Sequence, residues 1–355
     1  MAWGTRKNSN DQQMREAGQK SLLIVGNPLP FHVGHHFFSA AEKLGIKVSL
    51  YDTRTAGSKS RIIQALYWKL ADHRPANLYN FNQNLIARCQ QEQPGWVLAI
   101  GIAPIKEKTL QTLHRLGITC VNFLTDDPWN QAHYARWFLK TLPLYHHLFT
   151  PRQANLVELK VSGCKSVHYL PFAYNPEVHY PEVPTQEAKA KLAADIVFTG
   201  GADSDRLPWI SALIESDLRL ALYGNYWERY PSMQPYARGH ADLATLRQVV
   251  NASAVNLCLV RRANRDGHVM RTFEVPAMGG CMLTEHTDEH QRILGPEGEA
   301  VTYFHSIPEM LEKAKWLLQN ATERQRITYT ACQRITQNHH TYQDRLTTIL
   351  QLIDL

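Results

Sequence analysis

Short apolar runs that alternate with helical patterns constrain the fold of this 355-residue chain more than any other feature. The run SLLIVG stops at Gly26, and it is followed by the helical GHHFFSAAEKLG and then by IKVSLYD, which is a β-α-β pattern. The same alternation continues through PGWVLAIGI, KEKTLQTLHRLG and ITCVNFLTDDP. Strands that alternate with helices indicate a parallel sheet that is covered by helices on both faces.

The alternation is interrupted by a proline-rich stretch and then restarts. Pro171, Pro176, Pro181 and Pro184 lie within 14 positions, which is typical of a linker, and ADIVFTGG begins the second series of strands. We therefore predict an α/β protein with two Rossmann-like doubly wound domains that face each other across a cleft. The predicted parts are a disordered leader (1–20), an N-terminal domain (21–170), a proline-rich linker (171–190), a C-terminal domain (191–335) and a C-terminal helix (336–355), for which packing against the N-terminal domain is one option.

Composition describes a globular protein with a modest positive charge. Hydrophobic residues make up 44% of the chain and charged residues 20%, which is typical of a soluble domain. The net charge of +6 is small and dispersed, so it suits an anionic ligand and does not indicate nucleic acid. The first 20 residues hold no apolar signal segment, and no later run approaches a membrane span. We predict a cytoplasmic protein without a transmembrane segment.

Neither the cysteines nor a histidine cluster indicates a metal centre. The six cysteines are far apart and form no C-x-x-C pair, so they predict neither a zinc site nor a disulfide framework. His32, His35 and His36 form an H-x-x-H-H cluster, but no cysteine or carboxylate joins them at ligand spacing. We therefore predict no bound metal.

Loops after parallel strands are where ligands bind in such sheets. FLTDDPW ends a strand of the first domain and places Asp126 and Asp127 at this edge. Two acids there could orient an acceptor hydroxyl or act as a general base, whereas an Asx turn or a helix cap before Pro128 is the structural alternative. His32, in the loop after the first strand, is the third catalytic candidate.

The stretch NRDGHVMRTFEVPAMGG follows a strand of the second domain and begins a short helix. Glu274 lies near the helix N-terminus, where backbone N–H groups and the helix dipole are a sufficient structural reason for a carboxylate. The same carboxylate could accept two hydrogen bonds from the 2′ and 3′ hydroxyls of a ribose. Asp266 lies eight positions before Glu274, which gives an acid-x7-acid spacing.

Four segments resemble a known family when they are taken in order: DIVFTGGADSDR, LYGNYW, NRDGHVMRTFEVPAMGGCMLTEHTDEH and GEAVTYF. They resemble the CgeB-like branch of the group 1 glycosyltransferases, and the acid-x7-acid spacing resembles the E-x7-E signature of retaining GT-B glycosyltransferases, with Asp replacing the first Glu. The resemblance covers about residues 195–345, and the first half matches only in layout and in TDDPW. It implies a GT-B fold and a metal-independent, retaining transfer without a cofactor, from a nucleotide-sugar to an acceptor.

The resemblance also implies roles for residues of the second domain. Glu274 would hold the ribose, Asp266 and the backbone at Gly267 would hold hydroxyls of the donor sugar, and Arg206 and Arg271 would bind the diphosphate. The further donor-side candidates are Gly200, Gly201, Tyr223, Gly224, His268, Thr272 and Phe273. Two alternatives keep this architecture: a GT-B-like nucleotide-sugar epimerase, and a non-catalytic protein that binds a nucleotide or a sugar.

Overall fold

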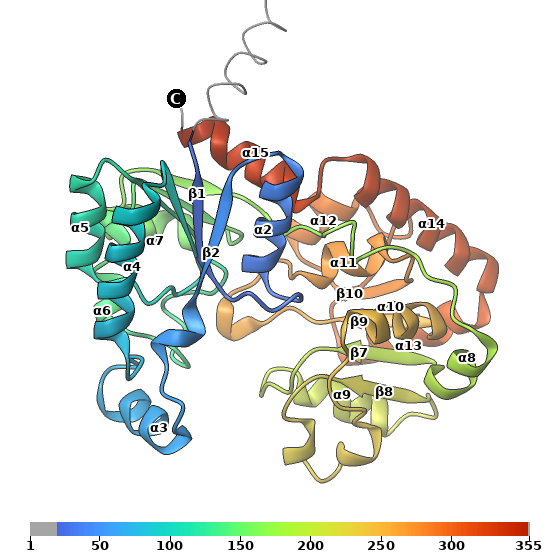
Figure 1. The fold of residues 1–355 in the computed structure, drawn as a ribbon. Helices are drawn as coiled ribbons and strands as arrows, with labels where there is room; N and C mark the ends of the chain where they lie inside the picture. Colours follow the sequence, from blue (N-terminus) through green and yellow to red (C-terminus); the bar gives the residue numbers. More distant parts are fainter. Residues whose placement is uncertain (1–19, 354–355) are drawn as a thin grey trace, which may run out of the picture. The chain divides into compact units, whose positions relative to one another are not determined.

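The computed structural model describes residues 20–353 (Figure 1). The predicted leader, residues 1–20, lies outside these residues except for Lys20. The chain divides into two compact units, of which the first runs to Pro171 and includes Arg345–Leu355, and the second comprises Phe172–Asp344. Within residues 20–353, no helix is both long enough and apolar enough to cross a bilayer.

The first unit contains a six-stranded parallel sheet with the order β2-β1-β3-β4-β5-β6. Its strands are β1 (Leu22–Gly26), β2 (Val48–Asp52), β3 (Trp96–Ile100), β4 (Thr119–Phe123), β5 (His147–Thr150) and β6 (Val167–Tyr169). Its helices are α2 (Val33–Lys43), η1 (Thr53–Ala56), α3 (Arg61–Leu70), α4 (Leu78–Glu92), α5 (Glu107–Arg115), α6 (Arg136–Leu139), η2 (Leu142–Leu144), α7 (Asn155–Val161) and most of α15 (Tyr342–Ile353).

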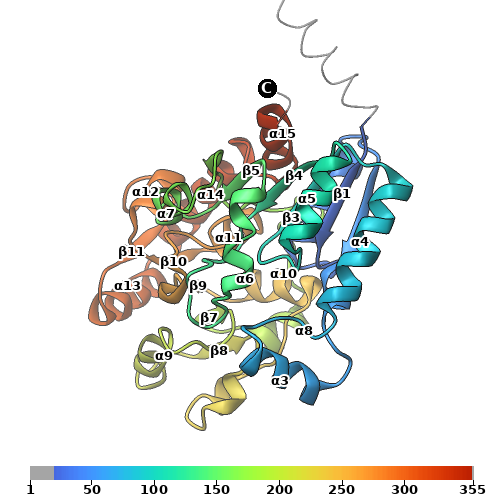
Figure 2. The same cartoon turned by 90° about the vertical axis from the view of Figure 1, so that its left-hand side faces the viewer.

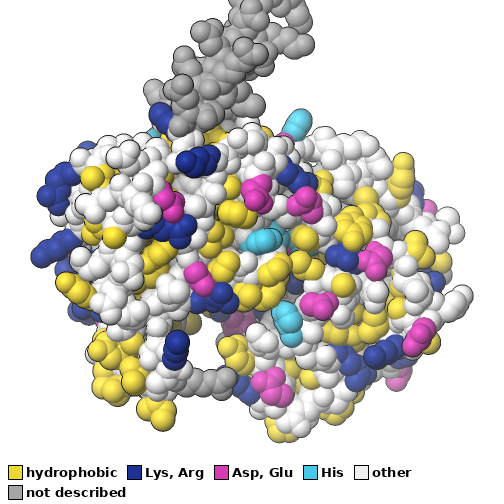
Figure 3. All heavy atoms as spheres, viewed as in Figure 1, with side chains coloured by type: hydrophobic (Ala, Val, Ile, Leu, Met, Phe, Trp, Pro, Cys, Tyr) yellow, Lys and Arg dark blue, Asp and Glu magenta, His cyan; other side chains and the backbone are white. Residues whose placement is uncertain are grey.

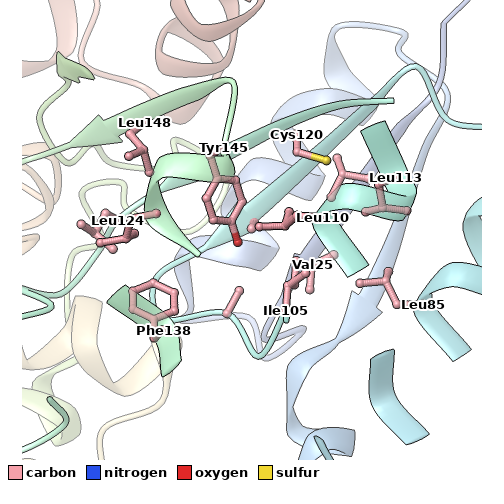
Figure 4. Packing of buried hydrophobic residues seen from close by; sticks show 14 of the residues in the cluster. Val25, Leu85, Ile105, Leu110, Leu113, Cys120, Leu124, Phe138, Tyr145 and Leu148 are labelled. Carbon is pink, nitrogen blue, oxygen red and sulfur yellow. The ribbon is translucent and has the colours of Figure 1, made fainter. Parts of the chain in front are cut away.

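Alternation along the strands determines which helices cover each face of this sheet. Leu23 and Val25 of β1 belong to the core under α4 and α5, where Leu85, Leu110 and Leu113 pack (Figure 4). The residues between them in β1 point to the opposite face, because successive side chains of a strand alternate. On that opposite side, α2 packs against β1 and β2. The view in Figure 2 shows α4 and α5 side by side along the strands.

The second unit contains a five-stranded parallel sheet with the order β11-β10-β9-β7-β8. Its strands are β7 (Ile196–Thr199), β8 (Leu220–Tyr223), β9 (Val255–Cys258), β10 (Met282–Glu285) and β11 (Thr302–Phe304). Its helices are α8 (Gln186–Leu192), α9 (Leu207–Ile214), η3 (Trp227–Arg229), η4 (Gln234–Tyr236), α10 (Leu243–Ala252), η5 (Arg262–Asn264), α11 (Arg271–Ala277), α12 (Asp288–Leu294), α13 (Ile307–Gln319) and α14 (Ala321–Gln337).

The second sheet is also covered on both faces. Ile196 and Phe198 of β7 pack with α9 and α13, whereas Val197 faces Val249 of α10 on the other side. Both sheets therefore confirm the predicted pair of doubly wound α/β units. The strand order reverses between β1 and β3 in the first unit and between β7 and β9 in the second. In open parallel sheets, ligands bind outside the carboxyl ends of the strands at such reversals.

The segment that was predicted to be a linker is held in place by specific contacts of the second unit. Asn175 Oδ1 accepts from the backbone N–H of Glu177, and the backbone N–H of His179 donates to the Asn175 carbonyl at 2.8 Å. Arg247 of α10 binds Glu182 at 2.6 Å. The helix α8 begins in the same segment because the Thr185 side chain accepts from the N–H of Ala188.

Candidate functional site

Arg271 joins the end of β7 to the start of α11, at the strand reversal of the second unit. Its Nε donates to Thr199 Oγ1 at 2.9 Å and to the Thr199 carbonyl at 3.2 Å. Burial lowers the pKa of Arg271 to about 10, which still leaves the guanidinium charged at neutral pH. The side chain nevertheless keeps 31% of its surface exposed. A fixed and partly exposed cation therefore lies where this fold class binds ligands.

Glu274 lies in the first turn of α11 and is bound to Arg271 one turn earlier. Arg271 Nη1 donates to Glu274 Oε2, and His179 Nε2 lies 3.6 Å from Glu274 Oε1. His179 Nδ1 accepts from the backbone N–H of Asn175 at 3.1 Å, so the proton of a neutral ring is on the nitrogen that faces Glu274. The carboxylate is thus positioned by a cation on one oxygen and by an imidazole near the other.

The Glu274 side chain is 1% exposed. A carboxylate has about four lone-pair positions, so contacts with Arg271 and His179 leave acceptor capacity for hydroxyl groups. A ribose can use that capacity only when the side chains that cover the carboxylate move. The structure therefore brings together two predicted donor-site residues, Arg271 and Glu274, in contact with each other.

The loop between β7 and α9 contains Gly200, Gly201 and Arg206. Arg206 Nη1 donates to the Gly201 carbonyl at 2.9 Å, and the guanidinium lies 5.3 Å from the centre of the Phe198 ring. Burial lowers the pKa of Arg206, while the charge of Asp203 opposes this shift. Within residues 20–353, the buried Arg206 Nε has no hydrogen-bond partner. A buried donor without a partner costs free energy, so this atom is suited to an anionic ligand.

Gly224 is the contact point between the loops that follow β8 and β7. Its φ is +138°, and a Cβ at this position would lie 2.3 Å from the Gly200 carbonyl oxygen. The indole N–H of Trp227 donates to the same oxygen at 2.8 Å. Only a glycine allows this approach of two backbones, and the approach fixes the loop that carries Gly200 and Gly201.

A buried hydrogen bond between His268 and Glu289 anchors the loop that contains Asp266, Gly267 and His268. His268 Nδ1 lies 2.6 Å from Glu289 Oε2, and His268 Nε2 accepts from the backbone N–H of Phe172 at 3.2 Å. Gly267 lies against Glu289, because a Cβ there would be 2.4 Å from the carboxyl carbon. The predicted donor-side residue His268 therefore has a positioning contact with α12.

Three further donor-side candidates are part of the interior of the second unit. Thr272 and Phe273 are fully buried in α11, and Tyr223 is buried in the core with Val197. Thr272 Oγ1 lies 2.9 Å from His290 Nε2, and His290 Nδ1 lies 2.8 Å from the Glu285 carbonyl. Burial lowers the pKa of His290 to about 4, so this histidine is neutral at neutral pH.

The acidic candidates of the first unit have different surroundings. Asp127 is buried, and its Oδ1 accepts from the backbone N–H of Trp129 at 3.0 Å and from Asn155 Nδ2 at 3.1 Å. This is the Asx turn that the sequence left as the alternative. Asp126 is half-buried and accepts from Thr125 Oγ1 at 3.1 Å.

His32, the third catalytic candidate, caps α2 without a side-chain capping hydrogen bond. Burial lowers the pKa of His32, the charge of Arg54 lowers it further, and the charge of Asp126 opposes both effects. A neutral imidazole is the form that can accept a proton. His32 and Asp126 therefore form an electrostatically coupled pair in the first unit.

One group in the first unit has the ligand types of a metal site: His114, Cys120 and His146 offer atoms within 4.8 Å of one another. Burial raises the pKa of the Cys120 thiol, which disfavours the thiolate that a metal requires. His146 Nδ1 already accepts from the Cys120 backbone N–H at 2.9 Å. Neither feature prepares the group for an ion.

Sequence reasoning did not identify three residues that position the site. Thr199 was read only as part of a strand, and it binds Arg271 through its carbonyl and its hydroxyl. His179 lies in the proline-rich segment, and Glu289 lies near the end of the quoted segment NRDGHVMRTFEVPAMGGCMLTEHTDEH, where it was given no role. The capping sequence TDEH, in which Thr287 accepts from the N–H of His290, could have indicated that a helix places Glu289.

The two doubly wound units define the GT-B fold, and solved structures of that class share it over almost their whole length. Sucrose-phosphate synthase from Thermosynechococcus elongatus has a TM-score of 0.72 at 11% identity, covering 94% of this chain and 98% of that chain. Anabaena HepE in complex with UDP and glucose has a TM-score of 0.65 at 10% identity, covering 95% and 100%. E. coli trehalose-6-phosphate bound with UDP-2-fluoro glucose has a TM-score of 0.62 at 13% identity, covering 93% and 99%.

A family model described as "glycosyl transferase-like" matches residues 206–351. The matched region includes Arg206, Asp266, Arg271 and Glu274. The C-terminal part of the chain is thus glycosyltransferase-like on a GT-B fold. No curated protein matches the chain.

Proposed function

We propose that this protein is a glycosyltransferase of the CgeB-like branch of group 1, and that its second unit binds the nucleotide-sugar donor. The family match from 206 to 351 supports this proposal, as does the GT-B fold. HepE in complex with UDP and glucose, which shares the fold, makes a uridine diphosphate sugar the first donor to test.

The observation that carries the proposal is the pair of arginines at the carboxyl edge of the second sheet. Arg206 follows β7 and has a buried Nε without a partner in the part of the chain that the structure describes. Arg271 contacts Thr199, the last residue of β7, and keeps part of its surface exposed. When a glycosidic bond to a nucleoside diphosphate breaks, negative charge grows on the departing phosphate. Cations fixed at that position stabilise the transition state.

In this proposal, Glu274 accepts hydrogen bonds from the ribose of the donor. Arg271 then shares its guanidinium between Glu274 and the phosphates, because one planar guanidinium offers five N–H donors. Asp266 and the backbone around Gly267 would contact hydroxyls of the donor sugar. The contact of Gly267 with Glu289 holds that loop in one conformation, which favours discrimination between donor sugars.

The acceptor would bind to the first unit, with His32 or Asp126 as the group that receives its hydroxyl proton. His32 suits this role because burial lowers its pKa and keeps the imidazole neutral. Asp127 suits it less, since its Oδ1 accepts from Trp129 and Asn155. Retention of configuration and independence from metals belong to the proposal because E-x7-E enzymes have these properties.

Calorimetric titration with UDP and with UDP-glucose tests the donor site. We expect Arg206→Ala and Glu274→Gln to weaken binding at least about tenfold, since a hydrogen bond to a charged group contributes about 1.5–3 kcal/mol. Arg219→Ala is the matched control, because Arg219 binds Asp195 at 2.7 Å before strands β8 and β7, at the opposite edge of the same sheet. Equal affinities in all four proteins would contradict the assigned site.

A turnover assay separates the proposed activity from its alternatives. Donor is incubated with and without a panel of hydroxyl-bearing acceptors, and sugar products are resolved by chromatography. A glycosylated acceptor supports the proposal. A new nucleotide-sugar isomer without an acceptor would indicate an epimerase, and tight binding without any product would indicate a binding protein. The anomeric configuration of the product, determined by NMR, tests retention.

A further inference from the structure

A cavity of about 780 Å³ lies at the carboxyl edge of the sheet in the first unit. Its walls come from the segments that follow three strands of this sheet: the end of α3 after β2, the start of α5 after β3, and the α6 region after β4. This is the edge at which doubly wound sheets bind ligands. None of its lining residues was identified from the sequence as part of a site.

The cavity is strongly positive. Its basic lining residues are Lys69, Arg74, Lys106, Lys108, Arg136 and Lys140. The acidic lining residues are Asp72 and Glu107, so the excess is four positive charges (six minus two). All six basic side chains are exposed, and none forms an ion pair within residues 20–353. Unpaired cations around a hollow attract an anionic partner.

The helix α3, which forms one wall, presents an apolar face to solvent. Ile62, Leu66 and Leu70 recur at helical spacing and are 83%, 55% and 77% exposed. Ile63 and Tyr67 continue the same face and are also exposed. Hydrophobic side chains gather over α3 at the lower left of Figure 3. Exposed large apolar residues are ordinary when scattered, but a whole helix face of them indicates an interaction surface.

Contacts at both ends of α3 connect the helix to the neighbouring loops. Gln64 Oε1 accepts from the backbone N–H of Ser58 at 3.1 Å, and the Trp68 ring stacks on His73 with ring centres 4.6 Å apart. His73 Nδ1 in turn lies 2.6 Å from the Tyr134 carbonyl. Among the described side chains of α3, only Gln64 is half-buried and the others are exposed. The apolar residues of the helix are therefore not packed against the rest of the protein, as they would be in an ordinary surface helix.

We infer that α3 and the basic cavity dock the first unit on a bilayer that contains anionic phospholipids. An amphipathic helix in such a surface buries its apolar face at the boundary of head groups and acyl chains, while neighbouring lysines and arginines attract lipid phosphates. The positive charge of the cavity favours an anionic bilayer over a second copy of the chain as the partner. A second copy would bring the same unpaired cations to the interface and would be repelled. The inference does not depend on the proposed transfer reaction.

Vesicle co-sedimentation of the full chain tests the inference. We expect the protein to sediment with phosphatidylglycerol–phosphatidylcholine vesicles, much less with pure phosphatidylcholine, and less at high salt. Ile62→Ser combined with Leu66→Ser and Leu70→Ser should lower the partition coefficient at least about tenfold. Lys106→Gln combined with Lys108→Gln should lower it about fivefold for each charge.

Two matched variants of the first unit serve as controls. Val157 and Val161 are exposed apolar residues on α7, and Lys160 and Lys165 are exposed lysines near them. Val157→Ser with Val161→Ser, and Lys160→Gln with Lys165→Gln, should leave vesicle binding unchanged. All substituted side chains are exposed, and circular dichroism spectra check that every variant is folded.

Each outcome decides for or against the inference. Selective loss of vesicle binding in the α3 and cavity variants supports it. Failure of the unmodified chain to bind anionic vesicles overturns it, as does equal loss in the α7 controls. Binding of inorganic phosphate or glycerol phosphate in the cavity, detected by calorimetry without vesicle binding, also overturns it in favour of a soluble anion.

Discussion

Replacement of Gly224 by alanine tests how the backbone of the second unit forms the candidate donor site. The new Cβ would lie 2.3 Å from the oxygen and 2.5 Å from the carbon of the Gly200 carbonyl, and both are backbone atoms that cannot rotate away. Overpacking of this kind costs about 1–3 kcal/mol. The φ of +138° adds strain of about 1–3 kcal/mol for any residue with a side chain. We expect Gly224→Ala to lower the free energy of unfolding by about 4 kcal/mol.

Gly298→Ala is the matched control, because it separates backbone strain from the steric clash. Gly298 is in the same unit and has a φ of +75°, but a Cβ there would meet no atom within 4 Å. It should therefore cost only the strain of a left-handed residue, about 1 kcal/mol. The two variants should differ by about 3 kcal/mol, which corresponds to roughly 6–12 °C in melting temperature for a domain of this size. Calorimetry or urea unfolding measures this difference.

Titration with UDP adds a functional result to the same pair of variants. Gly224→Ala pushes on the loop whose Gly201 carbonyl accepts from Arg206, so affinity should fall at least about tenfold while Gly298→Ala retains it. Equal destabilisation by the two substitutions would refute the packing argument. A loss of stability without a loss of affinity would preserve that argument and remove the loop from the donor site.

Two further predictions concern His290 and Asp127. Burial lowers the pKa of His290 from 6.5 to about 4. Between pH 6.5 and pH 4 the unfolded chain therefore binds more protons than the folded protein, and the free energy of unfolding falls as the pH falls. We expect a decrease of about 2 kcal/mol from pH 7 to pH 4.5. His290→Gln should reduce this dependence in urea unfolding at several pH values, whereas His240→Gln, at an exposed position, should not. Asp127→Ala should lower the free energy of unfolding by about 1–2 kcal/mol because Trp129 and Asn155 lose an acceptor, and Asp127→Asn should lose less. An inactive Asp127→Asn with unchanged stability would instead identify Asp127 as a general base.

The sequence predicted the secondary structure well where local periodicity is strong. Apolar runs bounded by glycine or proline became the parallel strands. The strand order could not be read from the sequence, because the reversal at β7 and β9 depends on which crossovers pack on which face. The helices α8 and α12 were not predicted, although each begins at a capping threonine.

The candidate site was predictable only where its members are close in the chain. Arg271 and Glu274 are three positions apart, so a helix places them on one face. The pairing of His268 with Glu289 and the approach of His179 to Glu274 depend on tertiary packing, for which the sequence has no local signal. The exposure of the apolar face of α3 could not be predicted from the sequence either, because an amphipathic pattern does not tell which side of a helix faces the core. The roles of the predicted site residues and the cytoplasmic location stay predictions.

The return of the chain to the first unit at Arg345 has a practical consequence for protein production. Arg345 Nε donates to the Pro171 carbonyl at 3.0 Å, and Leu346 and Ile349 are at most 2% exposed. A gene that stops after residue 171 would omit all three side chains. A stand-alone N-terminal half should therefore be made by splicing codons 345–353 behind codon 171 through a short flexible spacer.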